Sequence, residues 1–493
     1  MVPRPTLSPT ALLESPLVKD RDAGSMQRQL YERLQRAILD GSLAPGSRLP
    51  GSRALAEALA ISRNTVTATY EHLAAEGYVQ PDRQGTRVTH LSSLALQKKK
   101  RVRKTAGTPA TAQRLAQIKP GAPRAETDAA LRPGVPALSH FPLAAWRRAL
   151  DRAIRGAGSA SLGYGDPLGE PALRAAIARH LSMARGVRCA PHQVVIAEGA
   201  QEAISLCVRL LSNPGDIGWV EDPGYRGVKA AMHAGDMRVV PVRVDAEGLC
   251  ASDADWLRHP PRLIYTTPSH QYPVGAVLSI ARRLDLIAQA RQHGAWIIED
   301  DYDSEFRHTG EPIGAMQGLV EDAPVLYVGT FSKTMFPSLR LGFLVLPEEL
   351  APGVQAPLEE MLRGGHRFEQ LAMADFIESG QFTRHLGRMR RLYRGRQQAL
   401  RLALHKHLKV PHEIEGGYCG LHLTVRLPAH FDDRQIAADA LRRGMAPSAL
   451  SGFAMQPLAT DNGLVLGYGN TPTELFEPLV KRLSLLVRAS QRS

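Results

Sequence analysis

One stretch without apolar periodicity, residues 92–129, most constrains how this chain can fold, because it is rich in Lys, Ala, Thr and Pro and has the composition of a linker. It separates a short N-terminal part of the 493-residue chain from a long C-terminal part. At roughly 150 residues per unit, the length suggests about three units that each bury a core. We therefore predict a tail at 1–26, a compact domain at 27–91, the linker, and a large domain at 130–493.

The net charge of +13 is distributed unevenly. Up to Gly121 the chain carries 19 Lys and Arg against 9 Asp and Glu, so this part contributes +10 and the remainder only +3. Such an asymmetry indicates an N-terminal part that binds a polyanion. Part of the excess lies in the basic run at 98–104, for which a solvated linker and a DNA contact both stay open.

Several classes of protein are excluded by what the sequence lacks. No run approaches the ~18 apolar residues of a bilayer span, and the first residues lack the apolar core of a secretory signal, so we expect a cytoplasmic protein without a membrane partner. The cysteines show no paired spacing, which predicts free thiols and no metal site. These cysteines are Cys189, Cys207, Cys250 and Cys419.

The first compact region has the periodicity of three short helices followed by a hairpin. Ser52 and Ser62 each precede an apolar series, so we expect them to cap the second and third helices. Two helices joined by about two residues predict a helix-turn-helix, and strands near 77–80 and 86–88 predict a β wing. The residues expected to face inward are Leu30, Leu34, Ile38, Leu55, Leu59, Val66, Tyr70 and Leu73.

The residues themselves narrow this prediction. The runs 46–56 (GSRLPGSRALA), 61–66 (ISRNTV) and 76–79 (EGYV) resemble the winged helix-turn-helix of GntR-family regulators. The resemblance implies that Gly85 and Thr86 at the wing tip reach the minor groove of double-stranded DNA. It also implies DNA contacts by Arg53, Ser62, Arg63, Asn64 and Thr67.

In the large region, three apolar strands end in polar residues. The strand 194–197 runs into Gly199 and a helix, 295–298 runs into an acidic cluster, and 325–329 runs into Thr330 and Lys333. Ligands of open α/β sheets bind beyond the carboxyl ends of parallel strands, so these ends are expected to share one crevice. A lysine amine, a carboxylate and a helix N-terminus for a phosphate are what pyridoxal phosphate requires.

The segment 330–341 (TFSKTMFPSLRL) resembles the lysine segment of fold-type I aminotransferases. Further matches follow in the expected order at 164–169 (YGDPLG), 221–225 (EDPGY), 268–273 (PSHQYP) and 299–303 (EDDYD). The fold implied is α/β: a winged helix-turn-helix joined to a fold-type I pyridoxal-phosphate-dependent transferase. The transferase part would have a mainly parallel sheet and a small C-terminal α+β domain.

The resemblance also assigns roles. Lys333 would form the Schiff base, Asp300 would pair with the pyridine nitrogen, Tyr302 would contact the ring hydroxyl and Tyr225 would stack on the ring. Tyr164 would reach the phosphate of a neighbouring subunit, which implies a homodimer. The phosphate would be held by Gly199, Ala200, Gln201, Thr330 and Arg340. Either His270 or Tyr272 would replace the Asn that aminotransferases place beside the ring hydroxyl.

The whole chain resembles the MocR subfamily of bacterial transcriptional regulators. One departure concerns 463–468 (GLVLGY), where Val465 stands in place of the Arg with which aminotransferases clamp the substrate carboxylate. A neutral side chain forms no charge-assisted pair, so efficient transamination is disfavoured unless another arginine, such as Arg226 or Arg132, compensates.

We therefore predict a pyridoxal-phosphate-dependent transcriptional regulator that binds an operator with two half-sites and senses the cofactor or an amine or amino-acid effector. Two alternatives remain at this level. One is a working aminotransferase with an accessory DNA-binding domain, and the other is a cofactor fold retained only as a dimerisation scaffold.

Overall fold

The computed structural model describes residues 16–18, 24–83, 85–90, 112–118, 129–311 and 313–490. The chain divides into two compact units between Ala110 and Thr111, within the predicted linker. The basic run 98–104 lies outside the described residues, as do most of the predicted tail and linker. Among the described helices, none combines the length and apolarity needed to cross a bilayer.

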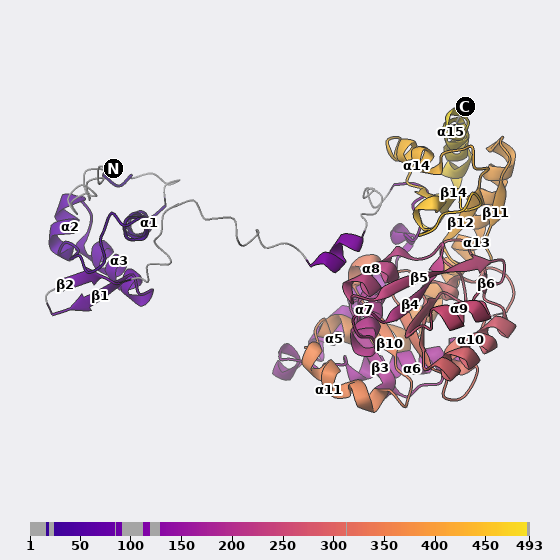
Figure 1. Ribbon diagram of the computed structural model, residues 1–493, viewed down its shortest axis with the longest axis horizontal. Helices are drawn as coiled ribbons and strands as arrows, with labels where there is room; N and C mark the ends of the chain where they lie inside the picture. The colour runs from indigo at the N-terminus through magenta and orange to yellow at the C-terminus, as the bar shows by residue number, and fades with distance from the viewer. Residues whose placement is uncertain are drawn as a thin grey trace. The chain divides into compact units, whose positions relative to one another are not determined.

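The first unit is a winged helix-turn-helix (Figure 1). Its helices are α1 (Met26–Leu39), α2 (Ser52–Ala58) and α3 (Arg63–Ala75), and its wing is the antiparallel pair β1 (Val79–Asp82) and β2 (Gly85–Val88). All eight residues predicted to face inward are buried in one apolar cluster. The hydrophobic periodicity was therefore sufficient to place this core.

The two predicted helix caps differ in outcome. Ser62 is the N-cap of α3, and its hydroxyl accepts a hydrogen bond from the Thr65 backbone N–H at 3.0 Å, as predicted. The prediction for Ser52 is wrong, because extended backbone ends one residue earlier and Gly51 is the N-cap of α2, without a side-chain cap. The Ser52 hydroxyl instead accepts a long hydrogen bond, 3.4 Å, from Arg63 Nε.

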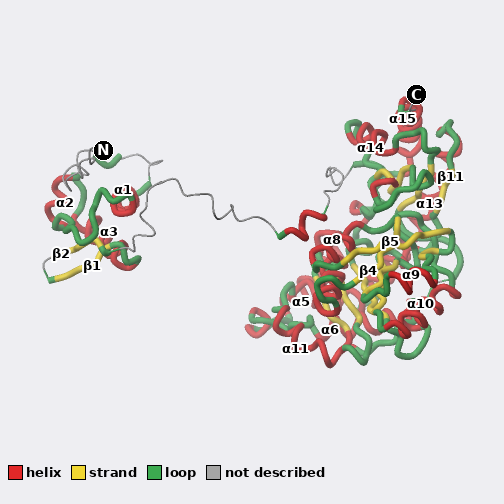
Figure 2. The backbone as a smooth tube through the Cα atoms, viewed as in Figure 1, coloured by secondary structure: helices red, strands yellow, loops and turns green. Residues whose placement is uncertain are grey.

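The second unit is built on an eight-stranded sheet with the order β3-β10-β9-β8-β7-β4-β5-β6 and helices on both faces (Figures 1 and 2). Strands β9, β8, β7, β4 and β5 run parallel, β10 is antiparallel to both of its neighbours, and β6 is an antiparallel edge. The bounds are β3 (Val194–Ala197), β4 (Ile217–Asp222), β5 (Arg238–Asp245), β6 (Gly248–Leu249), β7 (Leu263–Thr266), β8 (Trp296–Asp301), β9 (Val325–Thr330) and β10 (Gly342–Val345).

Strand β8 is longer than the predicted strand 295–298. Glu299, Asp300 and Asp301 belong to the strand, because pairing with β7 continues through Glu299 and pairing with β9 through Asp301. Buried partners compensate two of these carboxylates: Glu299 accepts the Met316 and Gln317 N–H groups, and Asp301 pairs with Arg185 at 2.7 Å. The acidic residues thus lie at the carboxyl end of a central strand of the sheet.

A four-stranded antiparallel sheet, ordered β11-β12-β14-β13, forms the predicted small C-terminal domain with α14 and α15. Its strands are β11 (Glu413–Glu415), β12 (His422–Arg426), β13 (Ser448–Ala449) and β14 (Gly463–Gly467). The helices of this unit are α5 (Leu143–Arg155), α6 (Pro171–Arg185), α7 (Ala200–Leu211), α8 (Arg226–Ala234), α9 (Asp253–Arg258), α10 (Ile280–His293), α11 (Ala351–Met361), α12 (Arg367–Glu378), α13 (Gln381–His407), α14 (Asp433–Leu441) and α15 (Phe476–Ala489). A short 3-10 helix, η2 (Gln113–Gln117), contacts α8 (Figure 2).

Candidate cofactor site and nucleic-acid interface

A cavity of about 410 Å³ lies where the large sheet meets the small sheet. Residues from the ends of β8 and β9 and from the start of α7 line one side of it, and Leu421, His422 and Phe453 of the small domain line the other. The three strand ends that the sequence predicted to converge do so here. The remaining lining residues are Pro133, Gly134, Ala200, Gln201, Tyr225, Arg226, Tyr265, Tyr272, Asp300, Tyr302, Asp303, Thr330, Ser332, Lys333, Pro337 and Arg340.

Lys333 follows β9 and extends its amine into this cavity. Its Nζ donates a hydrogen bond to the Gly134 carbonyl at 2.7 Å. Burial lowers the pKa of Lys333, and the charges of Asp303 and Asp300 oppose this effect. A lowered pKa increases the unprotonated fraction, which is the form that attacks an aldehyde.

Asp300 at the end of β8 has one carboxylate oxygen engaged and one open. Its Oδ2 accepts a hydrogen bond from the Tyr265 hydroxyl at 2.6 Å, whereas Oδ1 is buried and has no partner in the described part of the chain. Burial raises the pKa of Asp300 to about 7 against the opposing hydrogen bond from Tyr265. A protonated pyridine nitrogen would supply the missing donor, so this atom fits pyridoxal phosphate.

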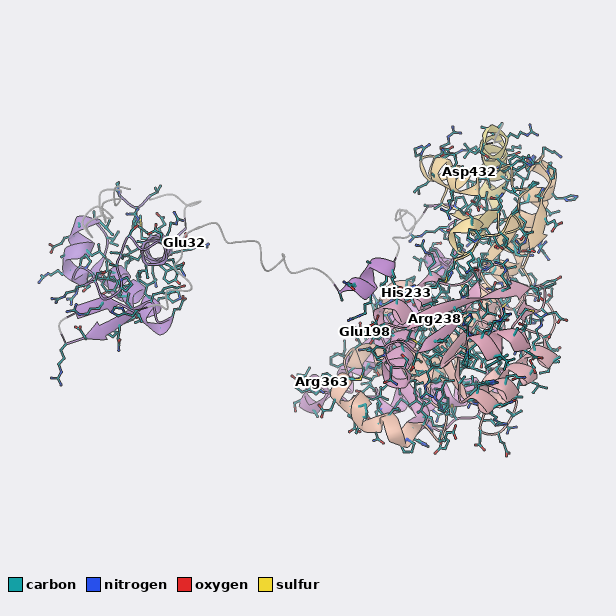
Figure 3. All side chains as sticks on the ribbon, viewed as in Figure 1. Glu32, Glu198, His233, Arg238, Arg363 and Asp432 are labelled. Carbon is teal, nitrogen blue, oxygen red and sulfur yellow. The ribbon has the colours of Figure 1, made fainter. Side chains whose placement is uncertain are left out.

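The start of α7 forms an anion cradle. Gly199 precedes the helix with φ of +87°, and a Cβ there would lie 3.4 Å from Nη1 of Arg340. The Arg340 guanidinium donates to the carbonyl of Glu198, a residue labelled in Figure 3. Free N–H groups at a helix N-terminus and a guanidinium beside them bind a phosphate. Ala200, Gln201 and Thr330 line the cavity at the same place.

Aromatic side chains form the wall beside Asp300. The ring of Tyr225 stacks near Tyr265 with 6.4 Å between centroids, and its hydroxyl donates to Gln201 Oε1 at 3.1 Å. Burial raises the pKa of Tyr225 to about 12, so the phenol is neutral. A flat ring between this wall and Lys333 is compatible with the stacking role predicted for Tyr225.

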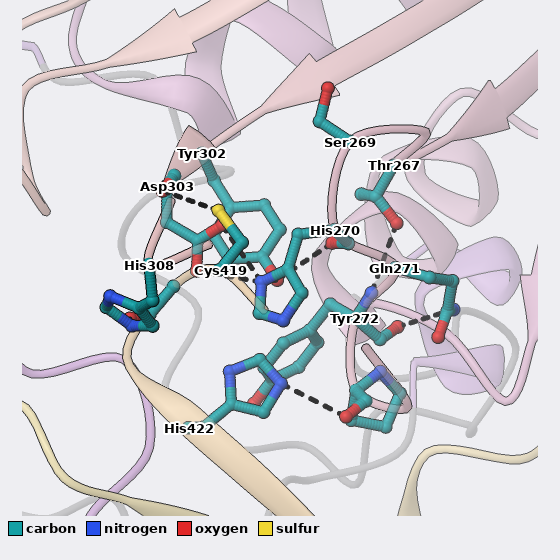
Figure 4. Close-up of polar contacts among 12 residues, drawn as sticks. Thr267, Ser269, His270, Gln271, Tyr272, Tyr302, Asp303, His308, Cys419 and His422 are labelled. Carbon is teal, nitrogen blue, oxygen red and sulfur yellow. Dashed lines mark hydrogen bonds and ion pairs between the residues drawn. The ribbon is translucent and has the colours of Figure 1, made fainter. Parts of the chain in front are cut away.

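Behind Tyr302 lies a buried polar network (Figure 4). The Tyr302 hydroxyl lies 3.0 Å from the His270 carbonyl, to which it donates, and 3.1 Å from His270 Nδ1. That nitrogen also lies 3.0 Å from Asp303 Oδ1. Tyr272 lines the cavity and His270 does not, so the geometry favours Tyr272 between the two alternatives left open by the sequence.

His270 and Asp303, together with His422, are also close enough to share a metal ion, since their ligand atoms lie within 4.8 Å of one another in the described part of the chain. His270 Nδ1 is already bonded to Asp303, and His422 Nε2 is hydrogen-bonded to the Pro273 carbonyl at 3.0 Å. We assign these side chains to the hydrogen-bond network rather than to a metal.

Val465 lies in the core of the small sheet rather than in the cavity. It is fully buried in β14 among Leu450, Phe453 and Tyr272. Arg226, at the start of α8, lines the cavity, and Arg132 lies close enough for its charge to lower the pKa of Lys333 further. The position where the resemblance expects a carboxylate-binding arginine therefore carries a buried neutral side chain, while Arg226 lines the cavity and Arg132 lies near the lysine.

Tyr164 lies apart from the other predicted cofactor residues. Its side chain is 91% exposed and does not line the cavity.

Sequence reasoning missed several wall residues, chiefly Tyr265, His422 and Phe453. A signal existed for Tyr265, because a tyrosine within a short apolar strand needs a buried hydroxyl partner, which Asp300 provides. His422 and Phe453 come from the small domain, and their position depends on tertiary packing that no local pattern shows.

In the first unit, the predicted DNA-contacting residues lie on α2, on α3 with its N-cap, and on the wing. Arg53, Ser62, Arg63, Asn64 and Thr67 are exposed on α2 and α3, and Gly85 and Thr86 begin the second wing strand. A hollow of about 340 Å³ connects α3 to the wing, with Arg48, Thr67 and Thr86 in its wall. Arg48 was not predicted from the sequence, and a Cβ on Gly85 would come within 2.8 Å of its Nε.

Comparisons with known proteins agree with both units. The model of the family "Bacterial regulatory proteins, gntR family" matches residues 26–88, and that of "Aminotransferase class I and II" matches residues 133–443. The probable rhizopine catabolism regulatory protein MocR of Rhizobium meliloti is 40% identical over 92% of each chain. The pyridoxine biosynthesis transcriptional regulator PdxR of Corynebacterium glutamicum is 33% identical over 93% of this chain and 95% of its own.

A solved structure extends the comparison to the fold. LysN, the α-aminoadipate aminotransferase of Thermus thermophilus complexed with N-(5'-phosphopyridoxyl)-L-leucine, superposes with a TM-score of 0.67 at 27% identity. The match covers 77% of this chain and 97% of that one.

Fold and site together define a class: DNA-binding transcriptional regulators whose second domain has the fold of class I and II aminotransferases. Within this class, the chain belongs to the MocR family of GntR-type regulators.

Proposed function

We propose that this regulator binds pyridoxal phosphate through Lys333 and responds to the cofactor or to an amine or amino-acid effector in the same cavity. The observation that carries the proposal is the convergence of three groups on one cavity. These are the Lys333 amine, the open Oδ1 of Asp300 and the anion cradle at the start of α7, where Ala200, Gln201 and Arg340 line the cavity and Gly199 lies just before them.

When bound, pyridoxal phosphate supplies an aldehyde that condenses with primary amines. Lys333 provides the competing amine, and Asp300 would hold a proton on the pyridine nitrogen. Arg340 and the start of α7 would hold the phosphate, with Gly199, Ala200, Gln201 and Thr330 around it. Tyr225 would pack on the ring, and the Tyr302 hydroxyl, which donates its proton to the His270 carbonyl, would contact the ring hydroxyl as an acceptor. An incoming amine that displaces Lys333 changes which groups fill the cavity.

Ligand binding in the cavity would alter DNA binding by changing the relative populations of open and closed forms of the protein. Leu421, His422 and Phe453 bring the small domain to the cavity wall, so a ligand that contacts both sides shifts the balance between open and closed forms. We further propose that the protein acts in the cytoplasm, at the nucleoid, as a homodimer that reads two half-sites. In that dimer the exposed Tyr164 would complete the partner's phosphate site.

A turnover aminotransferase is the second candidate. It is favoured by the presence of Lys333, Asp300 and Tyr302, and disfavoured by Val465, which leaves the substrate carboxylate without its usual partner. Amino transfer from an amino acid to a keto acid, measured over many turnovers, distinguishes the two. Sustained transfer would replace the regulator-only proposal.

The central test compares operator affinity with and without pyridoxal phosphate, and then with single amines added. We expect wild-type affinity to change with the cofactor or with at least one amine, and the Lys333→Ala variant to lose both the cofactor absorbance band and that change. Equal affinities under all conditions would refute sensing. The Lys481→Ala variant serves as a lysine control, because Lys481 is exposed on α15 and pairs with Glu477 rather than with a residue of the cavity.

A further inference from the structure

The long helix α13 has an unusual charge composition. Its 27 residues contain seven Arg and one Lys and no Asp or Glu, although the chain beyond Gly121 carries a net charge of only +3. One side of the helix packs into the core through residues such as Leu386, Met389, Tyr393 and Leu400. The concentration of positive charge therefore belongs to this element rather than to the unit as a whole.

Three of the arginines have structural roles, since Arg390, Arg396 and Arg401 each donate to a backbone carbonyl outside the helix. The other four are exposed: Arg384, Arg388, Arg391 and Arg394, here called the arginine face. Spacings of four, three and three residues place them on neighbouring positions of the helix surface.

No carboxylate in the described part of the chain pairs with the arginine face. Within the described residues, none of its four members forms an ion pair, and Arg384 donates only to the Ser379 carbonyl at 3.1 Å. At the C-terminal end of the same helix, by contrast, Glu477 pairs with Lys406 at 3.5 Å and with His407 at 3.0 Å. The unbalanced charge is thus confined to the first half of α13.

An exposed helix face normally mixes both signs of charge, because like charges three or four residues apart cost a few tenths of a kcal/mol per pair. A series of exposed arginines on a helix without acidic residues lacks this balance of charge and is suited to binding a polyanion. The guanidinium group is the cation that matches phosphate oxygens bidentately.

We propose that the arginine face binds the phosphate backbone of double-stranded DNA, in addition to the contacts of the winged domain. This proposal rests on the DNA-binding function proposed above and assigns a second contact surface to the aminotransferase-like unit. Because phosphate contacts carry no sequence information, this surface adds affinity and salt dependence without adding base specificity.

The test uses the full chain with its cofactor and long duplexes that contain either the operator or an unrelated sequence. In the double variant Arg388→Gln/Arg391→Gln, we expect weaker binding to both duplexes. The slope of log K against log salt should be shallower by about 0.9 for each phosphate that the variant no longer neutralises, and the ratio of operator to unrelated affinity should be unchanged. The double variant Arg384→Gln/Arg394→Gln should show the same changes in affinity and salt dependence as the first double variant.

The control variant Arg443→Gln/Arg488→Gln removes the same net charge from exposed positions outside α13. An unchanged slope in both α13 variants, or an equal change in the control, overturns the proposal. A retained cofactor absorbance band shows that each variant is folded. If the wild-type protein itself binds no operator DNA, the proposed function fails as well, whereas specific wild-type binding with unaltered α13 variants refutes the arginine face alone.

Discussion

At the scale of single residues, the buried carboxyl of Asp300 is unfavourable in the cofactor-free protein. A carboxyl whose pKa is raised from 3.8 to about 7 destabilises the folded protein at pH values above the unfolded pKa, and the destabilisation is complete above about 7. We predict that Asp300→Asn stabilises the cofactor-free protein at pH 8 by up to about 4 kcal/mol, at about 1.4 kcal/mol per pKa unit. The gain should shrink as the pH falls toward 4.

Thermal unfolding of the cofactor-free wild type and variant across this pH range measures the effect. The same substitution should weaken binding of pyridoxal phosphate, because Asn carries no charge to pair with the ring nitrogen. A variant that is less stable than the wild type at pH 8 would contradict the assignment of the raised pKa.

The network behind Tyr302 gives a second prediction at this scale. If His270 and Asp303 act by orienting the Tyr302 hydroxyl, then His270→Gln should shift the pH midpoint of the cofactor absorbance band in the same direction as Tyr302→Phe. The double variant should match Tyr302→Phe alone, since coupled residues are not additive.

His308→Gln is the matched control, because His308 is buried nearby but bonds to Tyr468 and not to Tyr302. Additive shifts in the double variant would show that His270 acts on the cofactor by a separate route.

At the scale of elements, the two serines that precede α2 and α3 offer a natural comparison. Ser62→Ala removes the bond to the Thr65 N–H and should destabilise the winged domain by about 1 kcal/mol. Ser52→Ala removes no cap and should cost at most about 0.5 kcal/mol. Hydrogen exchange within α3 provides the measurement, and equal losses of protection in the two variants would disprove the difference in capping.

These elements also show what the sequence could predict. The inward residues of α1–α3 and the ends of β3 and β9 followed from local apolar patterns, which depend on the chain alone. The pattern failed at Ser52, where the helix begins one residue earlier with Gly51 as its N-cap, and at β8, where pairing with β9 extends the strand through Asp301. At β8, contacts between strands distant in sequence overrode the local signal, whereas at Ser52 the local signal was displaced by one residue.

At the scale of the whole molecule, the chain consists of two compact units with separate apolar cores. We predict two transitions in calorimetry, of which only the larger shifts to higher temperature with added pyridoxal phosphate, because a ligand stabilises the unit that binds it. In the Lys333→Ala variant this shift should be smaller. A single transition that moves as a whole with the cofactor would show that the units unfold together.

The candidate site shows the same division between local and global information. Lys333, Asp300, Tyr302, Tyr225 and Arg340 were placed by motifs that follow strand ends, and all five line the cavity. The wall supplied by the small domain was not predictable, because it depends on how two sheets pack.

Val465 has a consequence for how such a protein changes over generations. An arginine introduced at that position would overpack the cluster of Leu450, Phe453 and Tyr272, the last two of which also line the cavity, at a cost of about 1–3 kcal/mol. A single substitution at Val465 therefore does not by itself produce an amino-acid-processing enzyme. Smaller residues would first have to replace these neighbours. Each such substitution would leave a destabilising cavity before any transaminase activity could return.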